Sequence, residues 1–206
     1  MKVTDRVELI DHTMANCYFF ELGGKNFLVD AGTKGTGKKI MNYLRQKGIK
    51  LDYILITHYH PDHVGGVKEL SDAFQCKIIV SAADAPVVTG KQKMQPAKSL
   101  LSKMVAAMMK VQPVQNVTLT DDFMFEGIEP VMTAGHTPGS VSYYLQSEDV
   151  LFVGDAVVNS GGDLKINRAF TRDLQAAEKS KEIIMKHPAK IILSGHGEPY
   201  RKVQPP

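Results

Sequence analysis

Three of the seven histidines in this chain fall within six positions, and an aspartate lies among them. They belong to the segment THYHPDHVGG, which follows the apolar run YILI. Imidazole and carboxylate groups are the usual protein ligands of zinc, iron and manganese. In an extended segment His58 and His60 face the same side, so both can reach one metal ion. Pro61 then turns the chain, which directs Asp62 and His63 toward a different point where a second ion could bind.

Three further segments carry residues of the same types directly after an apolar run. They are TAGHTPGS, FVGDA and LSGHGEP, and their candidate ligands are His136, Asp155 and His196. If these runs are strands of one sheet, residues that follow them at the same end of that sheet converge on one site. The resulting set suits one or two metal ions, and Asp155 is suited to bridge a pair because a carboxylate has two oxygens. Cysteine is absent from the set, so a closed structural zinc site is not expected.

The elements that must position these residues alternate between strands and helices. Apolar runs bounded by turn residues predict strands at 7–10, 17–21, 27–29, 51–56, 77–81, 117–119, 123–125, 128–132, 142–145, 150–153 and 191–193. Helical periodicity predicts helices at 36–47, 66–74, 96–110 and 172–186. This order favours an α/β (α+β) fold in which two sheets pack together with helices outside. No linker-like stretch divides the chain, so residues 1–206 are expected to form a single domain.

The composition is that of an ordinary globular protein, with 43% hydrophobic and 23% charged residues. The net charge of +3 and the lack of a long Lys/Arg run argue against a nucleic-acid partner. The N-terminus, MKVTDRVELID, carries charges where a signal peptide needs an apolar stretch. No segment approaches the roughly 18 apolar residues of a membrane span. We therefore expect a cytoplasmic protein with no membrane partner.

The segment HYHPDH at 58–63 matches the HxHxDH signature of the metallo-β-lactamase fold superfamily, and the three later candidate ligands follow in that family's order. The segment NCYFFELGGKNFLVDAG also resembles the strands that open this fold. The resemblance implies a single domain built as a four-layer αββα sandwich with the metals at one edge. The ligand sets that it implies are His58, His60 and His136 for one ion and Asp62, His63 and His196 for the other, with Asp155 and a hydroxide as bridges.

Asp155 narrows the resemblance within the superfamily. Classical β-lactamases generally lack this aspartate, whereas glyoxalase II-like, lactonase-like and generic metal-dependent hydrolases have it. The resemblance thus implies two divalent ions, zinc first and iron or manganese as alternatives, and hydrolysis of a small ester, thioester or lactone by the bridging hydroxide. Asp62 and Asp155 are the residues expected to act in catalysis, with Asp62 orienting the hydroxide.

Three other functions stay open at this point. One is an oxidoreductase resembling the sulfur dioxygenases of this fold, which hold a single iron. Another is a phosphodiesterase, and the last is a protein that binds metal without catalysis.

Residues outside the ligand set are candidates for supporting and substrate-binding roles. Asp30, in LVDAG, is expected to fix the imidazole of a ligand histidine. Lys165 and Arg168 lie in the segment after Asp155 and could meet an anionic group of the substrate.

The methionine-rich segment 94–109 is expected near the metal edge if it follows the family's pattern. Methionine suits an adaptable apolar pocket, so Met104 and Met108 are expected to contact an apolar acyl part of a small-molecule substrate. The same cluster could instead be plain core or the face of a homodimer. Residues 88–116 could also act as a lid.

Overall fold

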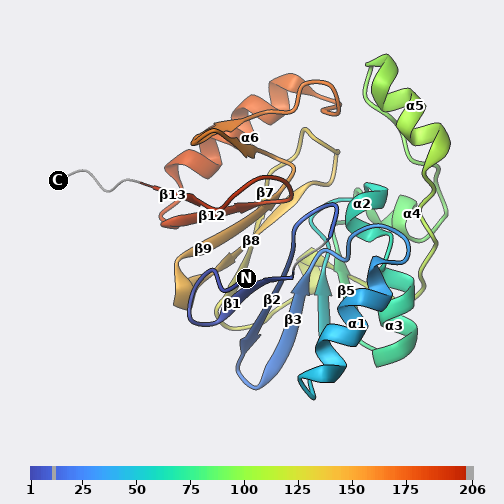
Figure 1. Ribbon diagram of the computed structural model, residues 1–206. Helices are drawn as coiled ribbons and strands as arrows, with labels where there is room; N and C mark the ends of the chain where they lie inside the picture. The colour runs from blue at the N-terminus through green and yellow to red at the C-terminus, as the bar shows by residue number, and fades with distance from the viewer. Residues whose placement is uncertain (11–12, 203–206) are drawn as a thin grey trace.

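The computed structural model describes residues 1–10 and 13–202. Two β-sheets lie face to face in it, and helices cover the outer side of each (Figure 1). The first sheet consists, in spatial order, of β1 (Val7–Ile10), β2 (Cys17–Leu22), β3 (Lys25–Val29), β4 (Tyr53–Leu55), β5 (Lys77–Val80) and β6 (Val117–Leu119). The second consists of β13 (Tyr200–Arg201), β12 (Ile191–Ser194), β9 (Val150–Gly154), β8 (Val141–Leu145) and β7 (Ile128–Met132).

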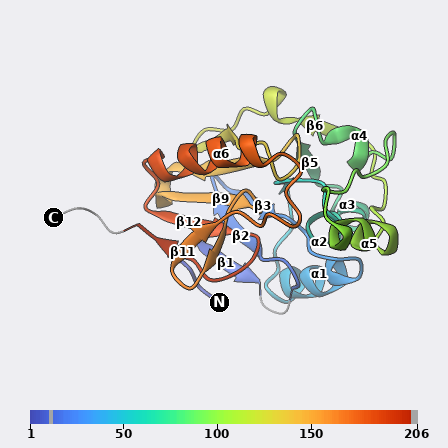
Figure 2. The same cartoon turned by 90° about the horizontal axis from the view of Figure 1, so that it is seen from above.

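The outer layers are made by helices on opposite sides of the sheet pair. The helices of the described residues are α1 (Thr36–Gln46), α2 (Pro61–Val64), α3 (Val67–Phe74), α4 (Ala85–Val88), α5 (Leu100–Met108) and α6 (Leu174–Lys186). Figure 2 shows α6 and α1 on opposite sides of the sheets, so the layers run helix, sheet, sheet, helix. This confirms the α/β (α+β) class and the four-layer αββα sandwich. None of these helices has the length and apolarity needed to cross a bilayer.

Apolar side chains from both sheets fill the space between them. Phe20 on β2 stacks on Phe152 of β9 with ring centroids 5.5 Å apart, and it stacks on Phe27 of β3 at 5.0 Å. Strands β3 to β6 run parallel, and β4 and β5 are largely buried on both faces, which explains why these two read as continuous apolar runs. Ile40 and Leu44, one helical turn apart on α1, seal the outer side of this sheet.

Two predicted elements differ from the structure. The strand expected at 123–125 is absent, since residues Thr120–Asp122 form a 3₁₀ turn and Phe125 makes only an isolated bridge to Ile128. The helix expected at 96–110 begins at Leu100, because the Ser99 hydroxyl accepts a hydrogen bond from the backbone N–H of Ser102 and caps it. Short elements that the sequence did not predict are α2, α4, the hairpin of β10 (Val158–Ser160) with β11 (Asp163–Lys165), and β13.

Candidate metal centre

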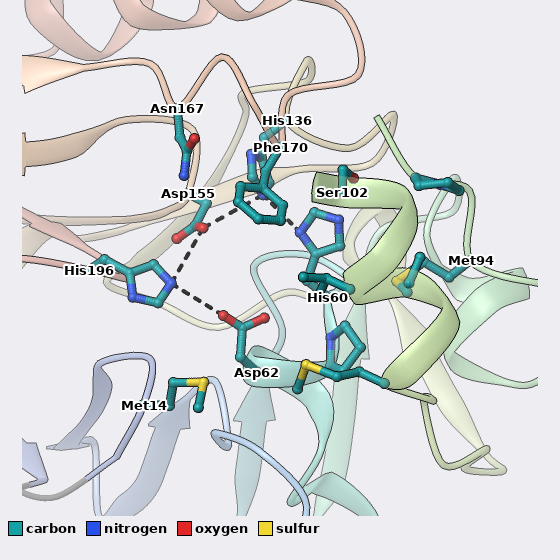
Figure 3. A pocket seen from close by; sticks show the side chains of 15 residues that line it. Met14, His60, Asp62, Met94, Ser102, His136, Asp155, Asn167, Phe170 and His196 are labelled. Atoms are coloured by element: carbon teal, nitrogen blue, oxygen red, sulfur yellow. Dashed lines mark hydrogen bonds and ion pairs between the residues drawn. The ribbon is translucent and has the colours of Figure 1, made fainter. Parts of the chain in front are cut away.

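The seven candidate ligands come together at one edge of the two sheets. Figure 3 shows His60, Asp62, His136, Asp155 and His196 of this set. The first sheet contributes the segment after β4, where α2 begins with proline at its first turn. The second sheet contributes the segments that follow β7, β9 and β12. The seven residues are His58, His60, Asp62, His63, His136, Asp155 and His196.

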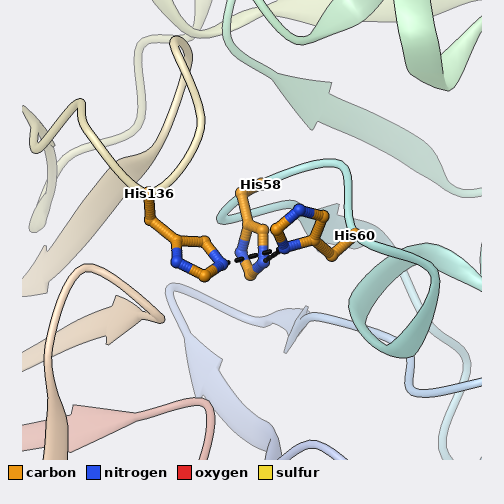
Figure 4. A group of neighbouring side chains, drawn as sticks. All are labelled: His58, His60 and His136. Atoms are coloured by element: carbon orange, nitrogen blue, oxygen red, sulfur yellow. Dashed lines mark hydrogen bonds between the residues drawn. The ribbon is translucent and has the colours of Figure 1, made fainter. Parts of the chain in front are cut away.

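His58, His60 and His136, called here the three-histidine group, point their ring nitrogens at one another (Figure 4). The Nδ1 atom of His60 lies 3.0 Å from Nε2 of His58 and 2.8 Å from Nε2 of His136. Each ring nitrogen carries either one proton or one lone pair. Hydrogen bonds among the three rings therefore satisfy these converging nitrogens poorly. Burial lowers the pKa of all three rings, to about 3 for His60, to about 4 for His136 and well below the usual value for His58. The rings are therefore neutral at pH 7, which is the state that binds a metal ion.

Asp62, His63 and His196, called here the carboxylate group, form a second cluster beside the first. The Nε2 atom of His196 lies 3.2 Å from Oδ2 of Asp62, and Nε2 of His63 lies 3.8 Å from the same oxygen. Burial would raise the pKa of Asp62, but the neighbouring His63 and His196 hold it at about 2. A negative carboxylate and two imidazoles are an appropriate ligand set for a divalent ion.

Asp155 is in reach of both groups. Its Oδ1 lies 3.4 Å from Nε2 of His63, and its Oδ2 lies 3.6 Å from Nε2 of His136 and 3.5 Å from Nε2 of His196. Burial would raise the pKa of this carboxyl, but His63, His136 and His196 lower it below its usual range. Asp155 is thus an anion held between two sets of imidazoles.

The chemistry of these atoms fits a pair of cations. In the described part of the chain, Nε2 of His63 and Oδ1 of Asp155 are buried and have no hydrogen-bond partner. Unpaired buried polar atoms are costly, and an ion between them would satisfy both. Gly195 leaves room for this arrangement, since a Cβ atom there would lie 2.4 Å from Oδ1 of Asp155 and from Cε1 of His63.

Asp30 lies behind the carboxylate group. Its carboxylate accepts hydrogen bonds from Nδ1 of His63 at 2.7 Å and from the N–H and hydroxyl of Thr57 at 2.9 and 2.7 Å. With Nδ1 of His63 donating, Nε2 is the nitrogen that faces the site, and in the neutral ring it carries the lone pair. Asp30 is thus placed where the sequence analysis expected a residue that fixes a ligand imidazole.

Asp84 is a buried residue of this site that the sequence analysis missed. Its Oδ2 accepts hydrogen bonds from the backbone N–H of Tyr59 at 3.0 Å and from the hydroxyl of Thr137 at 2.7 Å, and its Oδ1 accepts one from the N–H of Gly139 at 2.8 Å. Asp84 therefore ties the loop of His58 and His60 to the loop of His136. Burial raises the pKa of Asp84 to about 6, although these hydrogen bonds act to lower it. A signal was present, since Asp84 follows an apolar strand in SAADAP as the ligands follow theirs.

A cavity of about 350 Å³ opens over the candidate ligands (Figure 3). His60, Asp62, His136, Asp155 and His196 form its polar side. The remainder of its wall is mainly apolar and includes Met14, Met94, Pro96, Val105, Met109 and Phe170. The cavity can therefore enclose a small molecule with an apolar part next to the ligand cluster.

The structure does not place the four predicted substrate contacts in this wall. Met104 and Met108 are 55% and 82% exposed on the outer face of α5, because the helical period turns Val105 and Met109 inward instead. Lys165 is exposed on β11, and Arg168 lies 3.8 Å from Glu178 in an exposed ion pair. On α5, Val105 and Met109 line the cavity in place of Met104 and Met108.

Acidification is expected to release two bound ions in separate stages. Burial would lower the pKa of His63, but the carboxylates of Asp30, Asp155 and Asp62 raise it well above the usual value. The hydrogen bond with Asp62 also raises the pKa of His196. A raised pKa means that protons displace metal at a higher pH, so the carboxylate group should empty first. The three-histidine group, whose pKa values are lowered, should keep its ion until near pH 4.

Metal content per chain after dialysis across about pH 8 to 4 measures this order. We expect the metal content to fall in two steps. The variant His196→Ala should lack the step at higher pH. Loss of both ions in a single step would contradict it.

The chain matches the family described as "Metallo-beta-lactamase superfamily" over residues 10–196. "Probable metallo-hydrolase YflN" of Bacillus subtilis is 28% identical to it over 90% of this chain and 81% of that protein. "Thioesterase pkgB" of Emericella nidulans is 24% identical over 89% of this chain and 46% of that protein. Among solved structures, TTHA1623 in a di-iron-bound form has a TM-score of 0.74 and 24% identity, covering 95% of this chain and 93% of that one. Rm3 metallo-beta-lactamase has a TM-score of 0.74 and 21% identity, covering 95% of this chain and 77% of that one.

Proposed function

The chain belongs to the metallo-beta-lactamase superfamily as a metal-dependent hydrolase, and from this premise we propose that it cleaves a small ester, thioester or lactone at a site for two divalent ions. The observation that carries the proposal is the position of Asp155 between the two ligand groups, 3.4 Å from His63 and 3.6 Å from His136. A dinuclear centre supplies hydroxide near neutral pH and polarises the scissile carbonyl.

Different residues of this chain would hold the two ions and orient the water. The three-histidine group would hold one ion, the carboxylate group the other, and Asp155 both. Zinc is the first candidate, with iron or manganese as alternatives, because the set contains imidazole and carboxylate and no thiolate. Asp62 has its Oδ2 3.2 Å from His196 and lines the cavity, so its carboxylate can accept a hydrogen bond from the attacking water and orient it.

The wall of the cavity supports a carbonyl substrate with an apolar acyl part. Met94 and Met109 are flexible and can adapt to acyl groups of different shapes, and Phe170 adds a flat apolar surface. The relative from Emericella nidulans is named a thioesterase, which supports including thioesters. Among the residues that the structure describes, no lysine or arginine lines this cavity, which disfavours a phosphodiester as the substrate.

The test is a hydrolysis screen of protein loaded with zinc, iron or manganese. The panel contains p-nitrophenyl esters and acyl thioesters of increasing chain length, a lactone series and a phosphodiester. We expect turnover of carbonyl substrates that rises with acyl length until the cavity is full, and none of the phosphodiester. Phosphodiester cleavage alone would contradict the proposal, as would oxygen uptake with a persulfide by iron-loaded protein that hydrolyses nothing.

A further inference from the structure

The outward face of α5 carries an apolar stripe that no element of residues 1–10 and 13–202 covers. Of the ten large hydrophobic side chains that are exposed in the described part of the chain, four lie on this nine-residue helix. They are Leu100, Leu101, Met104 and Met108, with exposed fractions between 52% and 82%. The spacing of 100, 104 and 108 places three of them along one line of the helix. Leu101 lies beside that line, so the four form one surface, called here the α5 stripe.

The opposite face of the same helix belongs to the candidate active site. Ser102, Val105, Ala106 and Met109 line the cavity over the ligand cluster. Figure 3 shows Ser102 on this helix facing the cavity beside His60. Figures 1 and 2 both place α5 at the rim of the molecule, away from α6 and the second sheet. The α5 stripe is therefore free to meet a large partner while the inner face still shapes the cavity.

The chain segment that contains the α5 stripe carries charge of a single sign. Residues 85–120 contain five lysines and neither aspartate nor glutamate, although the whole chain has a net charge of only +3. The remainder of the chain is therefore net acidic, and the basic charge is concentrated in this segment. Lys103 lies on α5 itself, Lys98 just before it and Lys110 just after it, and all three are exposed.

We propose that the α5 stripe docks on the surface of a membrane that contains anionic phospholipids. A short helix with an apolar line flanked by lysines is the pattern of a segment that lies in the lipid interface. Anionic headgroups attract the lysines, and the apolar side chains enter the acyl boundary. A second copy of this chain fits less well, because a two-fold interface through α5 would bring the lysines of both copies together.

This surface contact departs from the expectation of no membrane partner, which rested on the lack of a membrane-spanning segment. Docking would place α5 between the lipid and the cavity, with its inner face toward the candidate ligands. The contact needs no spanning helix and is independent of the reaction, so it can be tested apart from the proposed hydrolysis.

Co-sedimentation with lipid vesicles tests the proposal. Vesicles of phosphatidylcholine alone are compared with vesicles of equal parts phosphatidylcholine and phosphatidylglycerol. We expect the wild-type chain to partition at least about tenfold more strongly onto the anionic vesicles, and this preference to weaken at high salt. The double variant Leu100→Glu/Met108→Glu should lose at least about tenfold of that binding. The matched control is Met124→Glu, since Met124 is 90% exposed and lies far from α5 in the sequence, and it should bind as the wild type does.

A second variant, Lys98→Gln/Lys103→Gln, keeps the apolar residues and should also weaken binding to the anionic vesicles. Circular dichroism melting of each variant confirms that the fold is retained. Equal binding of the wild-type chain to both vesicles, or to neither, would overturn the proposal. So would a dimer, measured by light scattering, that Leu100→Glu/Met108→Glu dissociates, because the stripe would then be a subunit interface.

Discussion

An Asp155→Asn variant is expected to lose about a thousandfold or more of kcat/KM on any carbonyl substrate that the wild-type protein hydrolyses. The carboxylate of Asp155 lies within 3.6 Å of imidazoles from both ligand groups, and its pKa is held below its usual range there. The neutral amide of asparagine cannot balance two cations in the same way. A loss of several kcal/mol of metal-derived stabilisation corresponds to about three powers of ten in rate. Metal content per chain should fall from about two to about one in the same protein.

The matched control for this variant is Asp163→Asn, which removes a carboxylate from the exposed end of β11. It should retain wild-type rates and metal content. Circular dichroism and the melting temperature show whether Asp155→Asn is folded. A folded Asp155→Asn protein with full activity and two ions would refute the dinuclear hydrolysis proposed here.

The ligand set could be predicted because its members carry local signals. Each candidate ligand follows an apolar run that became a strand, and the structure brings all seven to one edge of the sheets. The position of Asp30 beside a ligand could also be predicted, since this residue comes directly after a strand in the same way. The general arrangement of two sheets with outer helices followed from the order of the elements.

The wall of the cavity could not be predicted in the same way. Helical periodicity states which residues of α5 share a face, but it does not state which face turns inward. That orientation depends on tertiary contacts, such as the hydrogen bond from the hydroxyl of Ser99 to the carbonyl of Ala169 at 2.5 Å. Met104 and Met108 are thus on the outer face, and Val105 and Met109 on the inner one.

Asp84 illustrates a second kind of information that the sequence does not carry. Its partners are backbone N–H groups of Tyr59 and Gly139, which every residue type except proline provides. No pattern of side chains therefore marks the pairing of Asp84 with two loops that lie 25 and 55 positions away. Only the folded chain shows that one carboxylate supports both sides of the three-histidine group.

An Asp84→Ala variant is accordingly expected to lose stability and metal affinity together. It leaves the N–H groups of Tyr59 and Gly139 without their acceptor in a buried place, whereas the hydroxyl of Thr137 keeps its contact with the hydroxyl of Ser140. Each orphaned buried group costs about 1–3 kcal/mol, so we expect a loss of about 2–5 kcal/mol in the free energy of unfolding. The loops that carry His58 and His136 would no longer be tied together. Metal affinity should then fall roughly 10–100-fold, as is usual when a group that orients ligands is removed.

Urea unfolding of the metal-free protein measures the first effect, and competition with a chelator measures the second. Asp72→Ala is the matched control, because Asp72 is 65% exposed and its carboxylate forms a surface ion pair with Lys68, so its removal should cost less than about 1 kcal/mol. Asp84→Asn separates the two roles of Asp84. Asparagine keeps one acceptor oxygen but turns its NH₂ group toward a backbone N–H, so its effects should lie between those of wild type and Asp84→Ala. If Asp84→Ala were destabilised but bound both ions with unchanged affinity, the carboxylate would support the fold without positioning the ligands.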